Sequence, residues 1–238
     1  MNSTLCTISM RGDSQGAKNK HIRLINGKPL MYFTIKQAIQ SKIFDHIVVS
    51  TDSNKIFKIA KSCGADGWFL RPKKLALNSS PKIPAIKHAL FQAEKFYNKK
   101  FEKIVDLDAT SPLRKIEDIL NAYKFFVKKK ANILFTGCKS KKNPYFNMIE
   151  IKNNKVRIVK KLKKNIYRRQ DAPKTYDYNA SIYIWKRKSL INFKSFYTNK
   201  TVFYEMPESR SIDIDSELDF KLVEFLLKKK KNDKELLG

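Results

Sequence analysis

The 238-residue chain has few of the residues on which common nucleotide-binding and catalytic motifs depend. It contains 7 glycines, and no two of them have the G-x-G spacing of a dinucleotide-binding turn. It also lacks the G-x-x-x-x-G-K-[ST] phosphate loop and the G-x-S-x-G nucleophile turn. Its 3 histidines lack the spacing of metal ligands. These absences exclude the dinucleotide fingerprint, the Walker loop, the serine-hydrolase elbow and a histidine-based metal motif.

Long apolar runs and paired cysteines are also missing. No run approaches the roughly 18–20 apolar residues of a transmembrane helix. The first residues lack a basic segment followed by an apolar core, so we expect no secretory signal. The cysteines (Cys6, Cys63 and Cys138) are far apart and have apolar neighbours, which is typical of buried thiols in a reducing compartment. We therefore expect a cytoplasmic protein with no membrane partner.

Acidic residues are scarce compared with basic ones. The 22 Asp and Glu residues stand against 50 Lys and Arg, which gives a formal net charge of +28. Such an excess suggests a nucleic-acid partner. However, 41 of the basic residues are lysines, spread along the chain, whereas nucleic-acid surfaces favour arginine. We therefore favour a lysine-rich background of the kind an A+T-rich genome produces, with no specific nucleic-acid partner. A nucleic-acid-binding protein is the alternative of a different class.

Short apolar runs alternate with helical patterns in the first half of the chain. We expect strands over 5–9, 46–50, 67–70, 103–107 and 132–136, and helices over 29–41, 53–63, 84–97 and 116–129. This order predicts an α/β fold with a mostly parallel sheet flanked by helices. Ligands of such sheets bind at the carboxyl ends of the strands.

The pattern changes near residue 143. We expect a hairpin around Asn153–Asn154, a polar stretch, strands over 181–185 and 202–205, and a last helix over 217–229. The sequence thus predicts a nucleotide-binding α/β domain formed by residues 1–142 and 206–238. Residues 143–205 form a smaller, β-rich subdomain that is partly inserted and returns to the sheet.

A polar, basic loop follows the first predicted strand. Its cations can neutralise a polyphosphate: Arg11, Lys18, Lys20 and Arg23. Gly12 and Gly16 let the backbone approach a ligand closely, and backbone N–H groups with the Ser14 hydroxyl can form an anion nest. A solvated surface loop is the alternative interpretation.

Acidic residues stand near two other predicted edges of the sheet. Asp108 ends an apolar strand, where capping by Thr110 or Ser111 would explain the hydroxyls but not the carboxylate. Asp213 and Asp215 alternate in an extended segment, so both carboxylates share one face.

Two carboxylates on one face provide the hard oxygen ligands that suit Mg²⁺. Capping of the last helix by Asp215 or Ser216 is the alternative, and it leaves Asp213 unexplained. A phosphate loop combined with a two-carboxylate metal site predicts a nucleotidyltransferase, in which a substrate hydroxyl attacks the α-phosphorus of a nucleoside triphosphate.

Seven segments carry a resemblance to a known family: ISMRGDSQGAKNKHIR, INGKPL, VVSTDS, FLRPKKLA, LDATSPLR, RRQDAPKTYDYNASIYI and IDIDSELDF. In this order, over residues 4–227, the chain resembles the cytidylyltransferases that activate nonulosonic acids, namely the CMP-sialic acid synthetases and their bacterial relatives. NPYFNMIEI, LDATSPLR and KTYDYNASIYI are most similar to CMP-legionaminic acid synthases.

The resemblance implies a Rossmann-like, GT-A-like nucleotidyltransferase fold with a small dimerisation subdomain that completes the partner's site in a homodimer. It implies Mg²⁺-dependent transfer of CMP from CTP to the anomeric hydroxyl of a nine-carbon acidic sugar, with release of pyrophosphate. The product would be an activated sugar for surface glycan or glycoprotein synthesis. A 3-deoxy-octulosonate is the alternative acceptor.

The resemblance also implies residue roles. The positions that match nucleotide-binding ones are Arg11, Gly12, Ser14, Gln15, Lys20, His21 and Arg71. Those that match the sugar site are Lys82, Asp108, Thr110, Arg169 and Asn179. Asp213 and Asp215 match the metal ligands, and together with Arg11 and Lys20 they form the implied catalytic set.

Four positions depart from the family pattern. His21 replaces an Asn that contacts cytosine, and Asp13 replaces a Gly or Asn of the phosphate loop. Both changes bear on base selectivity, and a catalytically impaired relative is a further alternative. Asp108 replaces a Gln and Asp177 a common Arg, which suggests a different C5/C7 substitution pattern on the sugar.

Overall fold

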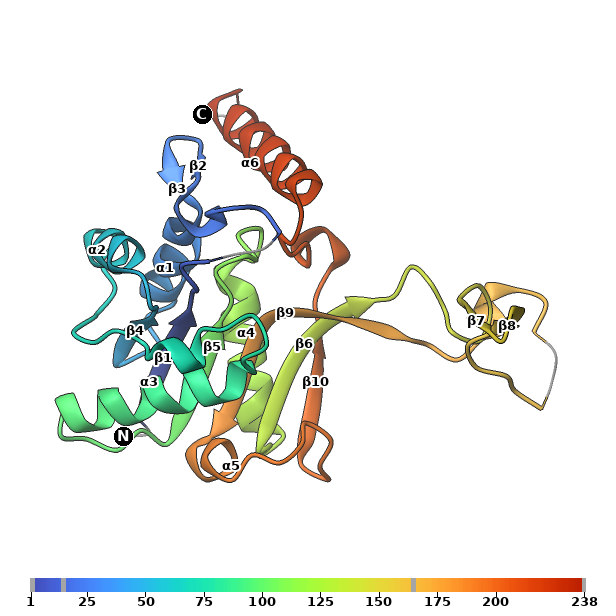
Figure 1. The fold of residues 1–238 in the computed structure, drawn as a ribbon, viewed down its shortest axis with the longest axis horizontal. Coiled ribbons are helices and arrows are strands. Elements are labelled where there is room, and N and C mark those ends of the chain that lie inside the picture. Colours follow the sequence, from blue (N-terminus) through green and yellow to red (C-terminus); the bar gives the residue numbers. More distant parts are fainter. Residues whose placement is uncertain (1–2, 14–15, 164–165, 237–238) are drawn as a thin grey trace.

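A six-stranded sheet with the order β10–β6–β9–β5–β1–β4 forms the centre of the molecule (Figure 1). The computed structural model describes residues 3–13, 16–163 and 166–236, with side chains to 229. The strands are β1 (Thr4–Ser9), β4 (His46–Ser50), β5 (Lys103–Leu107), β6 (Ile133–Lys139), β9 (Tyr176–Lys186) and β10 (Thr201–Glu205). β1 is parallel to β4 and β5, and β10 is parallel to β6, whereas β9 is antiparallel to both of its neighbours. The predicted α/β fold with a mostly parallel sheet is confirmed.

In the described part of the chain, six α-helices flank this sheet or extend from it. They are α1 (Leu30–Ser41), α2 (Asn54–Ser62), α3 (Lys82–Phe96), α4 (Ile116–Lys128), α5 (Arg187–Ile191) and α6 (Glu217–Leu236). The 3-10 helices are η1 (Lys20–Ile22), η2 (Lys73–Leu75), η3 (Arg169–Asp171) and η4 (Glu208–Arg210). Local chemistry explains where two of the helices begin. Pro29 precedes α1 in an extended conformation, and the Ser53 hydroxyl accepts from the Ile56 N–H at the start of α2.

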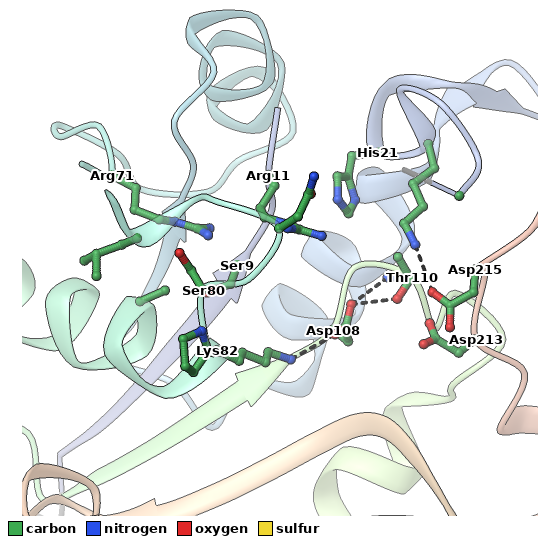
Figure 2. A pocket seen from close by; sticks show the side chains of 16 residues that line it. Ser9, Arg11, His21, Arg71, Ser80, Lys82, Asp108, Thr110, Asp213 and Asp215 are labelled. Carbon is green, nitrogen blue, oxygen red and sulfur yellow. Dashed lines mark hydrogen bonds and ion pairs between the residues drawn. The ribbon is translucent and has the colours of Figure 1, made fainter. Parts of the chain in front are cut away.

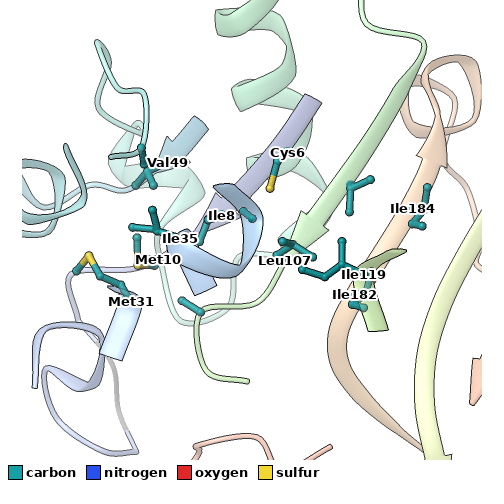
Figure 3. Close-up of a cluster of buried hydrophobic side chains, with 14 of the residues drawn as sticks. Cys6, Ile8, Met10, Met31, Ile35, Val49, Leu107, Ile119, Ile182 and Ile184 are labelled. Atoms are coloured by element: carbon teal, nitrogen blue, oxygen red, sulfur yellow. The ribbon is translucent and has the colours of Figure 1, made fainter. Parts of the chain in front are cut away.

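The two faces of the sheet carry different core clusters, because successive side chains of a strand point to opposite faces. Cys6 packs in a cluster with α1, α2 and α4, while its neighbour Leu5 packs in a second cluster with α3. Figure 3 shows Ile35 of α1 facing Ile8 of β1 across the first cluster. The layers are therefore helix, sheet and helix, and the strand-exit loops lie at the rim between them.

One predicted strand is wrong. Residues 67–70 form no strand, and only Asp66 makes an isolated parallel bridge to Val48. Trp68 and Phe69 pack instead against the core cluster beneath α3. Aromatic side-chain packing, rather than ladder hydrogen bonding, therefore fixes this segment.

Two small sheets complete the fold: β2 (Leu24–Ile25) with β3 (Lys28–Pro29), and β7 (Ile149–Lys152) with β8 (Lys155–Ile158). The β7–β8 hairpin turns at Asn153 and Asn154, both at positive φ, and stands away from the body (Figure 1). We call residues 143–175 around this hairpin the arm. β9 and β10 lie in the central sheet, so residues 143–205 do return to it, while their role as a dimerisation subdomain stays a prediction.

The cysteines are free thiols, with Cys6 and Cys63 buried and Cys138 half-buried. Burial raises the pKa of all three thiols, which keeps them protonated. Among the described residues, no helix has the length and apolar character that crossing a bilayer requires.

Candidate functional site

A cavity of about 340 Å³ opens where β1, β4 and β5 end (Figure 2). Most of the predicted site residues line it: Arg11, Lys20, His21, Arg71, Lys82, Asp108, Thr110, Asp213 and Asp215. Figure 2 shows Arg71 toward one end and the Asp213–Asp215 pair at the other. Ser14 and Gln15 lie outside the described residues. At the strand exits the fold thus brings together Arg11 and Asp215, which are 204 positions apart in the sequence.

The loop after β1 is held from two sides. The Gly12 N–H donates to Asp52 Oδ1 at 2.9 Å, at the end of β4. Arg11 Nη1 donates to the Leu77 carbonyl at 3.1 Å and to Asn78 Oδ1 at 2.9 Å. The first two residues of the loop are therefore held in place by contacts with two other loops, and phosphate binding by the loop stays a prediction. Asp52 was missed from the sequence because its role depends on a contact between two separate loops.

Gly16 packs directly against the segment that carries the two aspartates. A Cβ atom at this position would overlap the carbonyl oxygen of Asp215. Only glycine allows this close approach, so Gly16 fixes the distance between the basic loop and the acidic segment.

Lys20 links the basic loop to the acidic segment. Its Nζ donates to the Ile214 carbonyl at 2.5 Å and to Asp215 Oδ1 at 3.2 Å. The Lys20 side chain is 12% exposed and that of Asp215 is 80% exposed. The cation predicted to bind phosphate and a carboxylate predicted to bind metal thus meet at the mouth of the cavity.

The contacts at the start of α6 decide between its two predicted capping residues, Asp215 and Ser216. Asp219 Oδ2 accepts from the N–H groups of Asp215 at 3.2 Å and of Ser216 at 2.8 Å, and Ser216 Oγ accepts from the Asp219 N–H at 3.2 Å. Ser216 therefore caps the helix and the side chain of Asp215 does not. The capping prediction is thus confirmed for Ser216, and the Asp215 carboxylate, which contacts Lys20, has no capping role.

Asp213 has the most unusual environment of the two aspartates. Its Oδ1 atom is buried and has no hydrogen-bond partner within the described parts of the chain. Burial, together with the nearby charge of Asp108, raises the pKa of Asp213 to about 6. A buried carboxylate oxygen without a donor is costly unless a cation or a proton satisfies it.

These donors fit a divalent cation. Asp213 supplies an unpartnered oxygen and Asp215 an exposed one, and hard carboxylate oxygens are the ligands that Mg²⁺ takes, with phosphate oxygens and water completing its shell. Across the described ranges, no cluster of three His, Cys, Asp or Glu side chains could hold a metal ion alone.

Lys82 joins two carboxylates at the floor of the cavity. Its Nζ lies 2.8 Å from Asp106 Oδ2 and 2.9 Å from Asp108 Oδ2. Thr7 donates to Asp106 Oδ1 at 2.7 Å, and the Thr110 hydroxyl donates to Asp108 Oδ1 at 2.7 Å. Burial opposes the charge on Asp108, but the Lys82 ammonium and the Thr110 donors outweigh it and hold the pKa of Asp108 well below its usual range. Asp106 was not predicted as a site residue, because it lies inside the predicted strand over 103–107.

His21 and Arg71 are both buried. Desolvation lowers the pKa of His21 to about 4, and the charges of Lys20, Arg71 and Arg11 contribute in the same direction. The imidazole is therefore neutral at pH 7, and its Nδ1 has no partner among the residues the structure describes.

The Arg71 guanidinium donates to Ser50 Oγ at 3.1 Å and to the Met10 carbonyl at 3.0 Å, so it connects the ends of β4 and β1.

Arg169 and Asn179 do not line this cavity. Arg169 Nη2 donates to the Ser140 carbonyl at 2.8 Å in a separate cavity of about 560 Å³ at the base of the arm. Asn179 is buried in β9, where its Oδ1 accepts from Thr136 Oγ1 at 2.7 Å and its Nδ2 donates to Ser211 Oγ at 3.0 Å. Their role in sugar binding stays a prediction.

Comparison with known proteins decides the family. A family model described as Cytidylyltransferase matches residues 5–234. This chain belongs to the cytidylyltransferase family. The cytidylyltransferase is 47% identical over 227 residues to the CMP-N,N'-diacetyllegionaminic acid synthase of Campylobacter jejuni, covering 95% of this chain and 96% of the relative. It is 45% identical to the "Post-translational flagellin modification protein B" of Campylobacter coli, covering 97% of each chain.

More distant proteins agree with this assignment. The N-acylneuraminate cytidylyltransferase of Escherichia coli is 30% identical, with 97% of this chain and 53% of the relative covered. The solved structure of CMP:2-keto-3-deoxy-manno-octonic acid synthetase complexed with CTP superposes with a TM-score of 0.67 at 12% identity, covering 96% of this chain and 99% of the other. That likeness shows the fold. The cytidylyltransferase is thus a nucleotidyltransferase with a Rossmann-like sheet, as its motifs predicted.

Proposed function

We propose that this cytidylyltransferase transfers CMP from CTP to the anomeric hydroxyl of a nonulosonic acid resembling legionaminic acid, with release of pyrophosphate. One observation carries the chemistry: Lys20, Asp213 and Asp215 come from opposite ends of the chain and meet in one cavity at the strand exits. The identity of 47% with a relative named CMP-N,N'-diacetyllegionaminic acid synthase supports the choice of acceptor.

The basic end of the cavity would bind the nucleotide. Arg11 lines the cavity, and its loop, including the Gly12 backbone, would face the triphosphate. Ser14 and Gln15 of the same loop are further proposed contacts. The neutral His21 can offer one donor or one acceptor to the base, and its unpartnered Nδ1 supports that role. Arg71 holds the strand ends on which this subsite rests.

The acidic end would bind Mg²⁺ through Asp213 and Asp215. Bound there, the ion would polarise phosphate oxygens as a Lewis acid. The Lys20 ammonium, which already contacts this segment, would stabilise the negative charge that develops as pyrophosphate leaves. Both groups face a partly enclosed cavity, where electrostatic interactions are stronger than in bulk water.

The acceptor would lie beside the acidic floor. Asp108 and Thr110 present oxygen atoms there, while Lys82 acts mainly by holding Asp108 in place. Arg169, in the cavity at the base of the arm, is suited to a sugar carboxylate. We propose that the enzyme is a cytoplasmic homodimer, with arm residues completing the acceptor site. The exposed side chains of Ile151 and Val156 on the arm support such an interface, at 72% and 66% exposure.

Pyrophosphate release tests this function. CTP, UTP, GTP and ATP are each combined with legionaminic, sialic, pseudaminic and 3-deoxy-octulosonic acids in the presence of Mg²⁺. We expect release with CTP and a nonulosonic acid, fastest with legionaminic acid. Release only with the octulosonate would favour the alternative acceptor. No release with any pair would refute the function and favour an impaired relative.

A further inference from the structure

A second cavity lies at the opposite end of the sheet from the catalytic one. It measures about 610 Å³, and its lining residues lie where β5 and β6 begin and β9 ends, at the last turn of α4 and the first turn of α5. It shares no lining residue with the cavity of Figure 2. The function proposed above gives it no role.

The floor of this cavity is apolar. Phe101, Phe126 and Ala131 are buried beneath it, and Val127 on α4 remains 48% exposed at its edge. An alkyl or aromatic group placed here would remove apolar surface from water on both sides, which favours binding.

The rim of the cavity is basic. Six of the eleven lining residues are Lys or Arg, against 50 of 238 in the whole chain, so the lysine-rich background does not account for the rim. Glu102 is the single acidic residue in the lining. Buried Glu94, behind the rim, pairs with Arg187 at 2.6 Å and with Lys100 at 3.0 Å. Within the described residues, Lys130, Lys186 and Lys188 have no ion pair.

We propose that this cavity binds a small amphiphilic anion, an organic molecule with an alkyl or aromatic body and a phosphate, sulfonate or carboxylate head. The body would contact Phe126 and Val127, and the head would be held by Lys186 and Lys188. An inorganic anion would contact only the basic rim, and a neutral amphiphile would contact only the apolar floor. A ligand with both an apolar body and an anionic head would contact both parts of the cavity.

Calorimetric titration of the full chain tests the site, with saturating CTP and Mg²⁺ present to fill the catalytic cavity. The probes are decyl phosphate below its micellar concentration, inorganic phosphate and octyl glucoside. Decyl phosphate should bind at one site per chain, at least about tenfold more tightly than either of the other probes. Equal affinity for decyl phosphate and inorganic phosphate would overturn the proposal, as would decyl phosphate binding that occurs without CTP and is lost when CTP is present.

Variants locate the binding. Lys186→Gln combined with Lys188→Gln should weaken decyl phosphate binding about tenfold, since two charge-assisted contacts are lost. Val127→Glu should weaken it as well, by introducing repulsion at the floor. The matched control, Lys55→Gln with Lys58→Gln on the exposed face of α2, removes the same net charge elsewhere and should leave the affinity unchanged. Equal losses in the control, or wild-type affinity in both cavity variants, would refute the site.

Two sources of such an anion can be distinguished. Sedimentation with phosphatidylglycerol vesicles that Val127→Glu abolishes would identify a membrane lipid. Decyl phosphate binding without vesicle binding would identify a free, soluble amphiphile. Both results support the site. Folding of each variant is checked by its rate of pyrophosphate release from CTP, which depends on the distant cavity and should stay at the wild-type value.

Discussion

The two ends of the central sheet carry positive charge in different ways. At the catalytic end, cations alternate with carboxylates: Lys20 contacts Asp215, and Lys82 contacts both Asp106 and Asp108. At the opposite end, Lys186 and Lys188 line a cavity with a single acidic neighbour in its lining. In a chain with a net charge of +28, lysines are common everywhere, and the rarer acids distinguish the end at which metal-assisted chemistry is possible.

The difference also separates two uses of a lysine. A lysine between carboxylates fixes their charge and position, so its removal should change folding or catalysis. A lysine without an acidic partner contributes little to stability and is available to a ligand. The following predictions test this contrast.

The largest effect should come from Lys20. We expect Lys20→Ala to lower kcat for pyrophosphate release by roughly 10²–10³-fold, because one preorganised charge at the leaving group is lost. The free energy of unfolding should change by less than about 1 kcal/mol, since the partner Asp215 is exposed. Lys18→Ala, in the same loop, is the matched control and should retain turnover. Near-normal turnover of Lys20→Ala would refute the assignment.

Gly16 tests the spacing of the two segments at the catalytic end. Gly16→Ala would force a Cβ atom into the Asp215 carbonyl, so the basic loop and the acidic segment must separate. We expect about 10²-fold slower turnover, the order of loss that follows a 1 Å misplacement. For Gly12→Ala the nearest atom to the added Cβ is the Ser53 Cβ at 3.0 Å, and the Asp52 carboxylate oxygens follow at 3.5 and 3.7 Å, so this variant should lose much less. Equal effects in steady-state kinetics would contradict the proposed contact.

Substitutions of Lys82 and of Lys188 compare the two ends of the sheet directly. Lys82→Met leaves the buried Asp106 carboxylate without its cation and should lower the free energy of unfolding by about 2 kcal/mol. Lys188→Met removes the same charge at the other end and should change it by less than about 0.5 kcal/mol. Urea unfolding measures both values. If the two variants lost similar amounts of unfolding free energy, the acidic partners of the lysines would not distinguish the two ends of the sheet.

The pH dependence of stability should report on His21. Its pKa in the folded chain is about 4, below the usual value of 6.5, so the unfolded chain takes up a proton first as the pH falls. The free energy of unfolding should therefore decrease between pH 6.5 and 4, with a loss of about 1 kcal/mol by pH 5.5 from this group. His21→Asn should remove that part of the slope. Parallel slopes in the two proteins, measured by urea unfolding, would contradict a buried, neutral imidazole.

The smallest effect should appear with nucleic acid. We expect DNA and RNA to bind the wild-type chain only weakly at roughly 150 mM salt, with an affinity that falls steeply as salt rises. Fluorescence anisotropy measures this binding. Sub-micromolar affinity at that salt concentration would show that the surplus lysines form a nucleic-acid surface after all.

Local patterns in the sequence predicted most of the fold. The helices over 30–41 and 116–128 and the strands over 46–50 and 103–107 follow hydrophobic periodicity and β-branched runs, and each lies within a residue of its predicted bounds. Residues 67–70 were mispredicted because Trp68 and Phe69 pack against α3, a tertiary contact with no local signal. β9 was predicted too short, because its first residues pair with β6 across a register shift.

The sequence predicted the site less completely than the fold. The rule that ligands bind at strand exits, together with the resemblance, predicted that Lys20, Asp108 and Asp213 belong to one site, and all three line the same cavity. The contacts of Asp52 and Asp106 could not be read from the sequence, because each depends on which loops or strands become neighbours. Arg169 lies in another cavity, and a single chain does not bring it to the catalytic one.

The Mg²⁺ dependence of pyrophosphate release tests the central claim most directly, because that claim assigns the metal to the acids of the catalytic end. Rates with CTP and legionaminic acid are measured against Mg²⁺ concentration for the wild type and for Asp215→Asn. We predict that the variant requires at least about tenfold more Mg²⁺ for half-maximal rate, because a ligating carboxylate is lost. Superimposable Mg²⁺ curves for the two proteins would contradict the account.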